Sequence, residues 1–282
     1  MVIVGGGFAG IRTAKLLEQR LPSSWTLTLI DQENFITFNP LLPEVVGASL
    51  LPGHVVAPHR QMIQGGHVLM ARVKGIDTVR QLIRYVGEGP GVIRYDQLVL
   101  ACGVNASLDA VAGMADHGLP LKTLGDALHL RNRIIGRLEE AELQPDTDRR
   151  KWLTTFIIVG GGFSGVETAG ALVDFLYASL KYYRRIRCED LRVVLLQSDA
   201  RLLPELPAAL GDFTLRKMRG RHVDVRLNTR ASHVTGFGVR LESGEVIAGG
   251  TVISTIGSQP NALLDQIPAE RYRGRLRVNP DL

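Results

Sequence analysis

One short segment that occurs twice constrains the fold of this chain more than any other feature. The first copy, VIVGGGFAGIRTAKLL, begins at Val2, and the second, IIVGGGFSGVETAGAL, begins at Ile157. In each copy β-branched residues lead into a Gly-x-Gly-x-x-Gly turn, and small and apolar residues at helical spacing follow it. A strand, a tight turn and a helix in this order begin a dinucleotide-binding βαβ unit. Two copies therefore predict two such units.

Each glycine of such a turn has its own physical reason. The first allows a sharp turn, the second lets the backbone approach a pyrophosphate, and the third lets the helix pack closely on its strand. The unpaired N–H groups at the helix start then face the phosphates. A glycine-rich turn without a ligand is the alternative, and the duplication disfavours it. The predicted cofactor-binding residues of the turns are Gly5, Gly7, Phe8, Ala9 and Gly10 in the first copy and Gly160, Gly162, Phe163, Ser164 and Gly165 in the second.

The repeat extends well beyond the turns. Gly5 and Gly160 are each followed, at nearly the same separation, by an apolar segment that ends in glycine, at Gly103 and Gly257. Second strands are expected at 27–31 and 192–197, and alternating residues over 223–256 predict a meander of strands. The predicted fold class is α/β, with two Rossmann-like dinucleotide-binding domains in tandem repeats.

The residue at the end of the first unit's second strand is Asp31. A carboxylate at this distance from the glycine turn accepts hydrogen bonds from both hydroxyl groups of an adenosine ribose. A turn-forming aspartate at a strand end is the alternative. We therefore predict that Asp31 binds the ribose of the first dinucleotide.

Composition removes several classes of protein. The chain has 282 residues, of which 45% are hydrophobic, which suits two α/β domains. Its only two cysteines, Cys102 and Cys188, form no Cys-x-x-Cys pair, which argues against a redox-active dithiol. The seven histidines do not have the spacing of metal ligands, so we predict no metal. The net charge of +5 comes from scattered arginines, which predict solvated surfaces and no nucleic-acid binding. The sequence has no apolar run long enough to predict a transmembrane helix and no pattern of a signal peptide, so the expected compartment is the cytoplasm.

Other segments differ between the two repeats. Residues 34–63 form an apolar excursion with four prolines and no counterpart in the second unit, which suggests that the first unit covers a larger group such as a flavin ring. A strand is expected over 67–73, a buried strand over 97–101 and a helix over 208–219. Thr123 with Asp126 predicts a capped helix start. The polar residues 144–151 are the expected linker between the units.

Six segments resemble the type II NADH dehydrogenases, the non-proton-pumping NADH:quinone oxidoreductases among the glutathione-reductase-like flavoproteins. They are NFITFNPLLPEV, YDQLVLACG, KTLGDALHLRNRI, IIVGGGFSGVETAGAL, RLLPELPAALG and STIGSQPN. The resemblance implies that the second unit is inserted into the first and that each has a β-meander. It places the first part of an FAD-binding domain at 1–122, a connecting helix and linker at 123–151, an NAD(P)H-binding domain at 152–268, and an incomplete return to the first domain at 269–282.

The resemblance also implies cofactor contacts and a catalytic residue. FAD would bind the first unit and NADH, with NADPH as a variant, the second. Glu167 matches an acidic position near flavin and nicotinamide, where the first copy has Arg12; a simple helix-terminus charge is the alternative. The loop 39–42 would lie at the isoalloxazine ring. The further cofactor-binding residues are Asn39, Pro40, Leu41, Val73, Ala101, Gly103, Gln197 and Gly257.

Three departures from the family pattern qualify these expectations. Cys102 stands where the family has threonine and is expected to be a small buried residue. Gln197 stands where an acidic residue selects NADH, so we expect NADH to be preferred with weak discrimination against NADPH, partly supported by Asp199. A third FAD motif and a membrane-associating segment are not found before the chain stops, which indicates a C-terminal truncation.

The resemblance implies hydride transfer from NAD(P)H to FAD and onward transfer of electrons to a quinone or another small-molecule acceptor. The full-length protein would be cytoplasmic and peripheral on the inner face of the membrane, and a homodimer is allowed. The alternatives are a rubredoxin or ferredoxin reductase, a sulfide:quinone reductase, or a nucleotide-binding sensor without turnover. Sulfide chemistry needs cysteines at the flavin, and the sequence offers no suitable pair.

Overall fold

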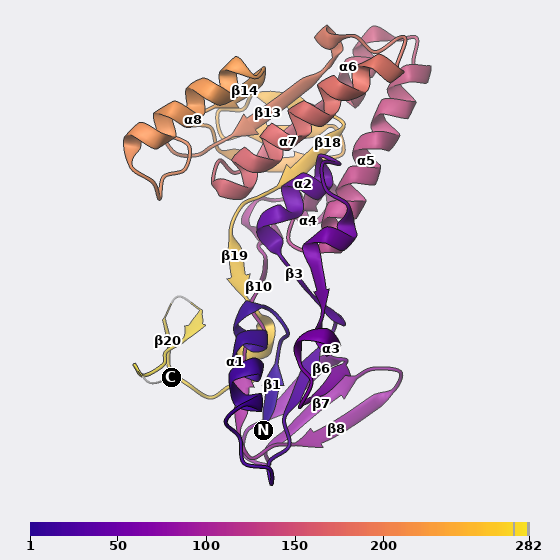
Figure 1. The fold of residues 1–282 in the computed structure, drawn as a ribbon. Helices are drawn as coiled ribbons and strands as arrows, with labels where there is room; N and C mark the ends of the chain where they lie inside the picture. Colours follow the sequence, from indigo (N-terminus) through magenta and orange to yellow (C-terminus); the bar gives the residue numbers. More distant parts are fainter. Residues whose placement is uncertain (273, 281–282) are drawn as a thin grey trace. The chain divides into compact units, whose positions relative to one another are not determined.

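The computed structural model describes residues 1–272 and 274–280 (Figure 1). The chain divides into two compact units. The first unit comprises residues 1–37 and 56–105 and the described residues from Ser258 onward, and the second comprises residues 38–55 and 106–257. The second unit is therefore inserted into the sequence of the first, as predicted. These units are defined by contacts, whereas the domains expected from the sequence are defined by cofactors, so the cofactor boundaries stay a prediction.

The first unit is built on a parallel sheet with the strand order β5-β2-β1-β9. Its strands are β1 (Val2–Val4), β2 (Thr28–Asp31), β5 (His67–Met70) and β9 (Leu98–Leu100). Helix α1 (Phe8–Glu18) connects β1 to β2 and buries Ile11 and Ala14 against Ile3 and Leu29 of the sheet. The apolar face of the helix thus fixes the glycine turn at the carboxyl end of β1.

Smaller elements complete the first unit. An antiparallel sheet contains β6 (Arg72–Asp77), β7 (Leu82–Val86) and β8 (Pro90–Arg94). Strand β3 (Phe35–Thr37) pairs with β4 (Val56–Pro58), which leads into α3 (His59–Met62). Strand β10 (Val104–Ala106) pairs with β19 (Ser258–Pro260), and β20 (Arg271–Tyr272) pairs with β21 (Arg275–Leu276). The side chain of Gln266, in η6 (Ala262–Gln266), accepts a hydrogen bond of 2.9 Å from the Ile76 N–H.

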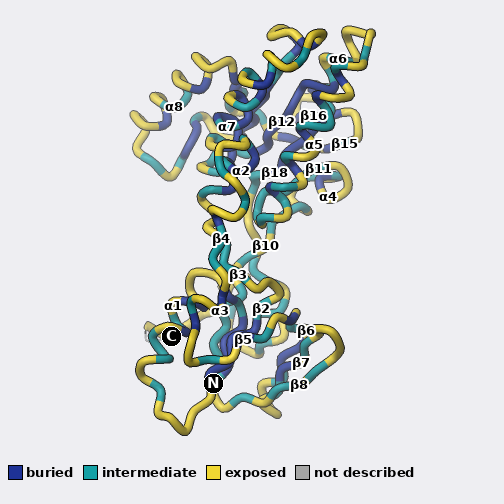
Figure 2. Tube along the Cα trace, turned by 45° about the vertical axis from the view of Figure 1, so that its right-hand side comes forward, coloured by how far each residue is buried: buried dark blue, intermediate teal, exposed yellow. Residues whose placement is uncertain are grey.

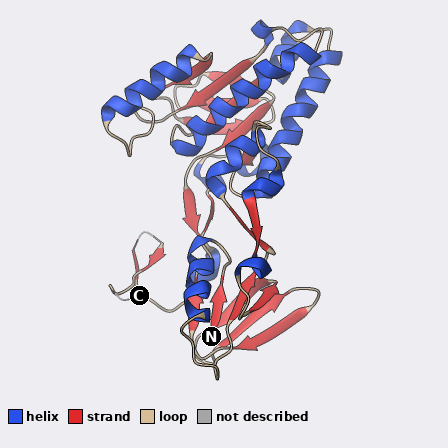
Figure 3. Ribbon diagram, viewed as in Figure 1, coloured by secondary structure: helices blue, strands red, loops and turns tan. Residues whose placement is uncertain are grey.

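The second unit is built on a parallel sheet of five strands with the order β11-β18-β12-β13-β14. These are β11 (Gly118–Pro120), β12 (Thr155–Val159), β13 (Arg192–Leu196), β14 (Val223–Arg226) and β18 (Thr251–Ser254). Helix α7 (Phe163–Ser179) connects β12 to β13, and α8 (Ala208–Gly220) connects β13 to β14. The central strands of this sheet are buried. Figures 2 and 3 show the sheet with its helices.

The meander expected over 223–256 was wrong in its extent. Only β15 (Ala231–Thr235), β16 (Gly238–Leu241) and β17 (Val246–Ala248) form an antiparallel meander. Strand β14 instead pairs in parallel with β13. Helix α8 supplies the crossover that parallel pairing requires, so a strand after it joins the main sheet.

The two units repeat the same core in the same order. Strand β1 lies between β2 and β9, as β12 lies between β13 and β18. The hydrogen bond that starts each turn is also repeated: Gly5 N–H donates to the Ile30 carbonyl at 2.8 Å, and Gly160 N–H donates to the Leu196 carbonyl at 2.9 Å. The sequence duplication is therefore a duplication of structure.

Two connections in the second unit show how local sequence sets helix starts. Helix α5 (Leu124–Leu143) begins with the predicted capping box of Thr123 and Asp126. The expected linker 144–151 is wrong, because residues Thr147–Leu153 form helix α6. The side chain of Asp146 accepts hydrogen bonds from the N–H groups of residues 148 and 149 and so caps this helix.

The excursion after β3 belongs by its contacts to the second unit. It contains η1 (Asn39–Leu41), α2 (Leu42–Val46) and η2 (Pro52–Val55). Helix α2 packs on α5 and α7, and a β-carbon on Gly47 would lie 2.9 Å from that of Ala171. Leu42, Val45 and Val46 are buried there, which explains the apolar character of the segment.

Candidate functional site

The first glycine of each turn is required by the backbone. Gly5 has φ +104° and Gly160 has φ +115°, a region that residues with a β-carbon rarely adopt. A β-carbon on Gly5 would overlap the carbonyl oxygen of Ala101, and one on Gly160 would lie 3.0 Å from that of Thr255. The closing strand of each unit therefore lies directly against its turn.

The third glycine of each turn is required by helix packing. A β-carbon on Gly10 would overlap the carbonyl oxygen of Gly5, and one on Gly165 would overlap that of Gly160. The start of each helix can approach its own turn this closely only without a side chain. Gly10 and Gly165 are accordingly buried.

The second glycine of each turn is not required by the chain itself. Gly7 and Gly162 both have φ −75°, which any residue adopts. Among the described atoms outside the immediate chain neighbours and the helix's own backbone, nothing lies within 4 Å of a β-carbon built on either residue. Open space beside a turn that is otherwise tightly packed fits a phosphate group that approaches the backbone there. Both turns therefore fit a dinucleotide pyrophosphate.

Both helices begin with backbone N–H groups that the helix itself does not use. The first helical bonds are donated by Ile11 to the Gly7 carbonyl at 2.9 Å and by Val166 to the Gly162 carbonyl at 3.0 Å. Within the described chain, neither helix has a side-chain cap at its start. The positive ends of α1 and α7 thus lie beside the open second glycines, which suits an anion. The predicted residues Phe8, Ala9, Phe163 and Ser164 form the first turns of these helices.

Asp31 lies at the carboxyl end of β2, directly beside the first turn. Its Oδ2 accepts a hydrogen bond from the Gly6 N–H, and its Oδ1 accepts one of 2.8 Å from the Glu33 N–H. The side chain remains partly exposed. The carboxylate is thus held at the turn, where the sequence placed a ribose contact.

His59 is a residue at this turn that the sequence did not single out. It is fully buried, and its Nε2 lies 2.9 Å from the Gly6 carbonyl oxygen. Among the residues that the structure describes, its Nδ1 has no hydrogen-bond partner. A β-carbon on Gly6 would overlap the imidazole ring, so the ring packs directly under the glycine loop. The sequence contained no signal for this contact, because His59 lies far from Gly6 along the chain.

Gln197 takes the position of Asp31 in the second unit. Its Oε1 accepts a hydrogen bond of 3.0 Å from the Gly161 N–H. Its Nε2 lies 3.0 Å from Asp199 Oδ2 and 3.3 Å from the Arg201 carbonyl oxygen. Gln197 is 6% exposed, whereas Asp199 is exposed. The amide is thus engaged by the protein on both sides.

The closing glycines, Gly103 and Gly257, have matching positive φ angles of +63° and +55°. Thr255 Oγ1 donates to the Val159 or Gly160 carbonyl, both at 3.0 Å; its counterpart by position in the first unit is Ala101. Cys102 is half-buried, and burial raises the pKa of its thiol. Both cysteines are free in the described structure, and the raised pKa makes Cys102 a poor thiolate nucleophile.

Glu167 lies in the first turns of α7, and the second unit also supplies Glu44 in α2. Glu167 is exposed at the surface of α7, and partial desolvation of its carboxyl raises the pKa, to which the negative charge of Glu44 adds. Glu44 Oε2 is buried, and no hydrogen-bond partner for it is found within the described residues. The sequence missed Glu44, whose role depends on the packing of α2 against α7.

The remaining predicted residues are spread over both units. Asn39, Pro40 and Leu41 form η1, where Asn39 Nδ2 donates to the Lys122 carbonyl at 3.4 Å. Val73 lies in β6, next to an irregularity in its pairing with β7, and packs on the first unit's core. These residues belong to different compact units, and their contacts to a cofactor stay a prediction.

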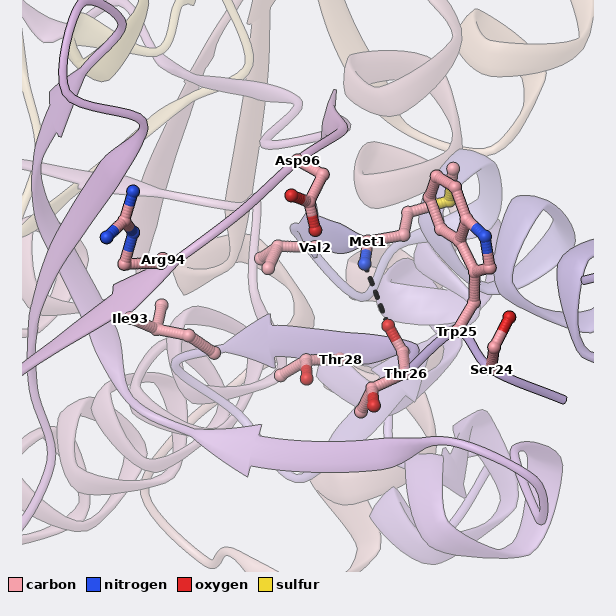
Figure 4. Close-up of a pocket in the computed structure, with 9 residues that line it drawn as sticks. All are labelled: Met1, Val2, Ser24, Trp25, Thr26, Thr28, Ile93, Arg94 and Asp96. Atoms are coloured by element: carbon pink, nitrogen blue, oxygen red, sulfur yellow. Dashed lines mark hydrogen bonds between the residues drawn. The ribbon is translucent and has the colours of Figure 1, made fainter. Parts of the chain in front are cut away.

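A surface depression of about 380 Å³ lies in the first unit, away from the glycine turn (Figure 4). It adjoins the amino ends of β1 and β2, where the Met1 amino group donates to the Thr26 carbonyl at 2.7 Å. Nucleotides bind at the carboxyl ends of parallel strands, so this depression is not the dinucleotide site. It is lined by Met1, Val2, Ser24, Trp25, Thr26, Thr28, Ile93, Arg94 and Asp96.

Residues 1–272 and 274–280 lack two further features. No group of three or more His, Cys, Asp or Glu side chains is arranged to hold a metal ion there. No helix in that part of the chain is both long enough and apolar enough to cross a membrane.

Two glycine-rich βαβ turns on parallel sheets, one unit inserted into the other, define a fold with two dinucleotide-binding domains. Residues 1–282 match the sequence profile of the pyridine nucleotide-disulphide oxidoreductases, and the chain belongs to that family.

Individual relatives narrow the similarity. The chain is 31% identical to the type II NADH:quinone oxidoreductase NdhA of Mycobacterium tuberculosis, over 100% of this chain and 63% of the relative. It is 25% identical to the external NADH-ubiquinone oxidoreductase 2 of Saccharomyces cerevisiae mitochondria, over 100% of this chain and 54% of the relative. The chain thus spans less than two thirds of the length of these relatives.

The solved structure of NDH2 from Plasmodium falciparum in complex with NADH has the same fold, with a TM-score of 0.86. Its sequence is 21% identical, and the match covers 94% of this chain and 56% of that one. The sulfide:quinone oxidoreductase of Aquifex aeolicus also shares the fold, with a TM-score of 0.71 and 17% identity over 94% of this chain and 60% of that one.

Proposed function

We propose that this chain is the nucleotide-binding part of an FAD-dependent NAD(P)H dehydrogenase that passes electrons to a quinone without pumping protons. The observation that carries the proposal is the open space at Gly7 and Gly162, next to two uncapped helix starts. Two such sites suit an enzyme that holds a flavin dinucleotide and a nicotinamide dinucleotide. The names of the relatives, which are NADH:quinone and NADH-ubiquinone oxidoreductases, support the acceptor.

The assignment of the two cofactors follows the resemblance to the type II NADH dehydrogenases. It also uses one difference between the repeats: Asp31 in the first unit is replaced by Gln197 in the second. The first unit is proposed to bind FAD, with its pyrophosphate at Gly7 and the helix start and its ribose at Asp31. The second unit is proposed to bind the nicotinamide nucleotide at Gly162, and a protein of the same fold that was solved with NADH supports the choice of nucleotide. Asn39, Pro40 and Leu41 are the proposed neighbours of the flavin ring.

The protein contributes binding, placement and proton control. A bound flavin supplies the two-electron chemistry that the side chains of this chain lack. The N–H groups at the starts of α1 and α7 hold the pyrophosphates, and Asp31 Oδ1 and Oδ2 fix the ribose. The Glu167 carboxyl holds its proton to a higher pH than an ordinary glutamate, so it is suited to exchange a proton when the acceptor is reduced.

The proposal includes a lipid-soluble quinone as the acceptor, and therefore exchange at the surface of a membrane, on its cytoplasmic side. Sulfide chemistry is not favoured, because the two cysteines are free and the thiol of Cys102 has a raised pKa. No observation favours a rubredoxin or ferredoxin reductase over a quinone reductase.

The proposal is tested by flavin reduction. The chain is incubated with FAD, freed of excess cofactor, and mixed with NADH under anaerobic conditions. Retained yellow colour that bleaches with NADH and returns on addition of a quinone supports the function. Bound flavin that NADH does not bleach, or bleached flavin whose colour no quinone restores, contradicts it.

A further inference from the structure

The amide of Gln197 is committed to the protein on both of its faces. Its Oε1 accepts from the Gly161 N–H at 3.0 Å, and its Nε2 donates to Asp199 Oδ2 at 3.0 Å and to the Arg201 carbonyl at 3.3 Å. Both N–H bonds of the amide are therefore used. Gln197 is 6% exposed, so it offers little of itself to a ligand.

Asp31 shows what this position does in the first unit. Its carboxylate accepts a hydrogen bond from the N–H of Gly6, which lies between Gly5 and Gly7. Gln197 accepts one from the N–H of Gly161 in the same way. The side chain of Asp31 therefore does two things: it holds the turn by this hydrogen bond, and it places a negative charge beside the turn. Gln197 fastens the second turn in the same way but brings no charge.

Asp199 brings the missing charge to the second turn. It lies two residues after Gln197, is exposed, and its Oδ2 is held by the Gln197 amide. Its backbone is fixed as well, because its carbonyl accepts from the Asn228 N–H at 3.0 Å. The carboxylate is thus held at the carboxyl end of β13, beside the turn that contains Gly161 and Gly162.

The charge of Asp199 is not paired with a cation in the described structure. Arg201 directs its Nη2 to the Pro204 carbonyl oxygen at 3.4 Å, within its own loop. A 2′-phosphate at this strand end would therefore meet a fixed negative charge.

We propose that Asp199, positioned by Gln197, is the residue that selects NADH over NADPH in the second unit. Its carboxylate accepts a hydrogen bond from an adenosine ribose hydroxyl and repels a 2′-phosphate. Gln197 acts only as the positioning residue, because its amide has no N–H left for a phosphate. The inference rests on the proposed function insofar as the second unit binds the nicotinamide nucleotide.

The test uses ADP-ribose and 2′-phospho-ADP-ribose, which bind without redox chemistry, in the presence of excess FAD so that the first turn is occupied. Their dissociation constants are measured by calorimetry at one fixed ionic strength, for the wild type and for Asp199→Asn. The ratio of the two constants is expected to shift toward the phosphorylated ligand by about tenfold, the change that one lost charge contact brings. Asp212→Asn removes an exposed carboxylate from α8 of the same unit and is expected to leave the ratio unchanged.

A charge exchange separates positioning from simple damage. The double variant Gln197→Glu with Asp199→Asn swaps the carboxylate and the amide and keeps a hydrogen bond between them, whereas the bond to the Arg201 carbonyl is lost. The new carboxylate accepts from Gly161 N–H as Asp31 accepts from Gly6 N–H and returns a negative charge to the strand end. Its repulsion of a 2′-phosphate is expected to restore the preference for ADP-ribose. A merely structural role for the pair would not predict this rescue.

Each outcome decides between the claims. An unchanged ratio in Asp199→Asn, with both ligands still bound, overturns the role of Asp199 and leaves the proposed function standing. Failure of the wild type to bind either ligand overturns nucleotide binding by the second unit, and the inference with it.

Discussion

Gly10 lies so close to Gly5 that a β-carbon on Gly10 would overlap the Gly5 carbonyl oxygen, and Gly165 stands in the same relation to Gly160. The second glycines differ, because at Gly7 and Gly162 no described atom lies within 4 Å of the added carbon, leaving aside the adjoining residues and the helix's own backbone. The protein's own packing thus requires glycine at the first and third positions of each turn. At the second position the protein leaves room for a side chain. Substitutions at these two kinds of position should therefore separate effects on stability from effects on ligand binding.

The first prediction compares Gly10→Ala with Gly7→Ala. Gly10→Ala forces the helix away from its turn, and overpacking of this kind costs about 1–3 kcal/mol of stability. Gly7→Ala meets no protein atom, so its cost is expected to stay below about 1 kcal/mol, the scale of a helix-start substitution. Thermal unfolding should therefore shift clearly only for Gly10→Ala, whereas flavin retention should fall in both. Equal losses of stability would contradict the distinction.

The second prediction concerns the pH dependence of Glu167. Partial desolvation of this exposed residue, with the charge of Glu44, raises the pKa of its carboxyl above the ordinary value of 4.5. The stability that Glu167 contributes is fully present below its unfolded pKa and is lost as pH rises through the raised folded pKa. Glu167→Gln does not titrate, so its melting temperature should exceed that of the wild type near neutral pH and match it near pH 4.

Two controls accompany the Glu167 measurement. Glu205→Gln removes an exposed carboxylate from the same unit and should give no pH-dependent difference. Glu44→Gln should lower the pKa of Glu167 only in part, since the partial desolvation of the carboxyl remains as the larger cause. In rapid-mixing experiments Glu167→Gln should slow acceptor reduction by about 10²-fold, the range of a lost acid–base group, and flavin reduction by less. Unchanged rates in both steps would make Glu167 a helix-terminus charge only.

The third prediction concerns His59, which supports the first glycine loop from beneath. His59→Phe keeps a ring of similar shape but leaves the Gly6 carbonyl without its 2.9 Å partner. Loss of a buried hydrogen-bond partner costs about 1–3 kcal/mol, so the melting temperature and flavin affinity should both fall. His67→Phe, at an exposed position of the same unit, is the control. A variant as stable as the wild type would show that the loop does not depend on this contact.

The sequence predicted those parts of the site that depend on local geometry. The order of strand, turn and helix sets the conformations of Gly5 and Gly160, and their φ angles confirm it. The capping box at Thr123 was equally local and was confirmed. Helix α6 was not predicted, because residues 144–151 are as polar as a linker, although Asp146 is an N-cap residue.

The parts that could not be predicted depend on contacts between distant segments. His59 meets Gly6 only after β4 pairs with β3, and Glu44 influences Glu167 only after α2 packs on α7. The contact of Gln197 with a cofactor stays a prediction, but the hydrogen bonds of its amide could not be predicted. The loop that follows β13 folds back and uses both of its N–H bonds, a feature of the folded loop and not of the residue type.

The central claim is that the two glycine turns hold two different dinucleotides, and one anaerobic titration tests it most directly. Wild type, Gly7→Val and Gly162→Val are each loaded with FAD and mixed with NADH while the visible absorbance of bound flavin is followed. The β-branched side chain fills the space left for a phosphate, so Gly7→Val should retain no flavin. Gly162→Val should retain flavin that NADH bleaches at a rate reduced by at least about 10²-fold, as expected when cofactor placement is lost. Full flavin retention by Gly7→Val, or wild-type bleaching of Gly162→Val, would contradict the account.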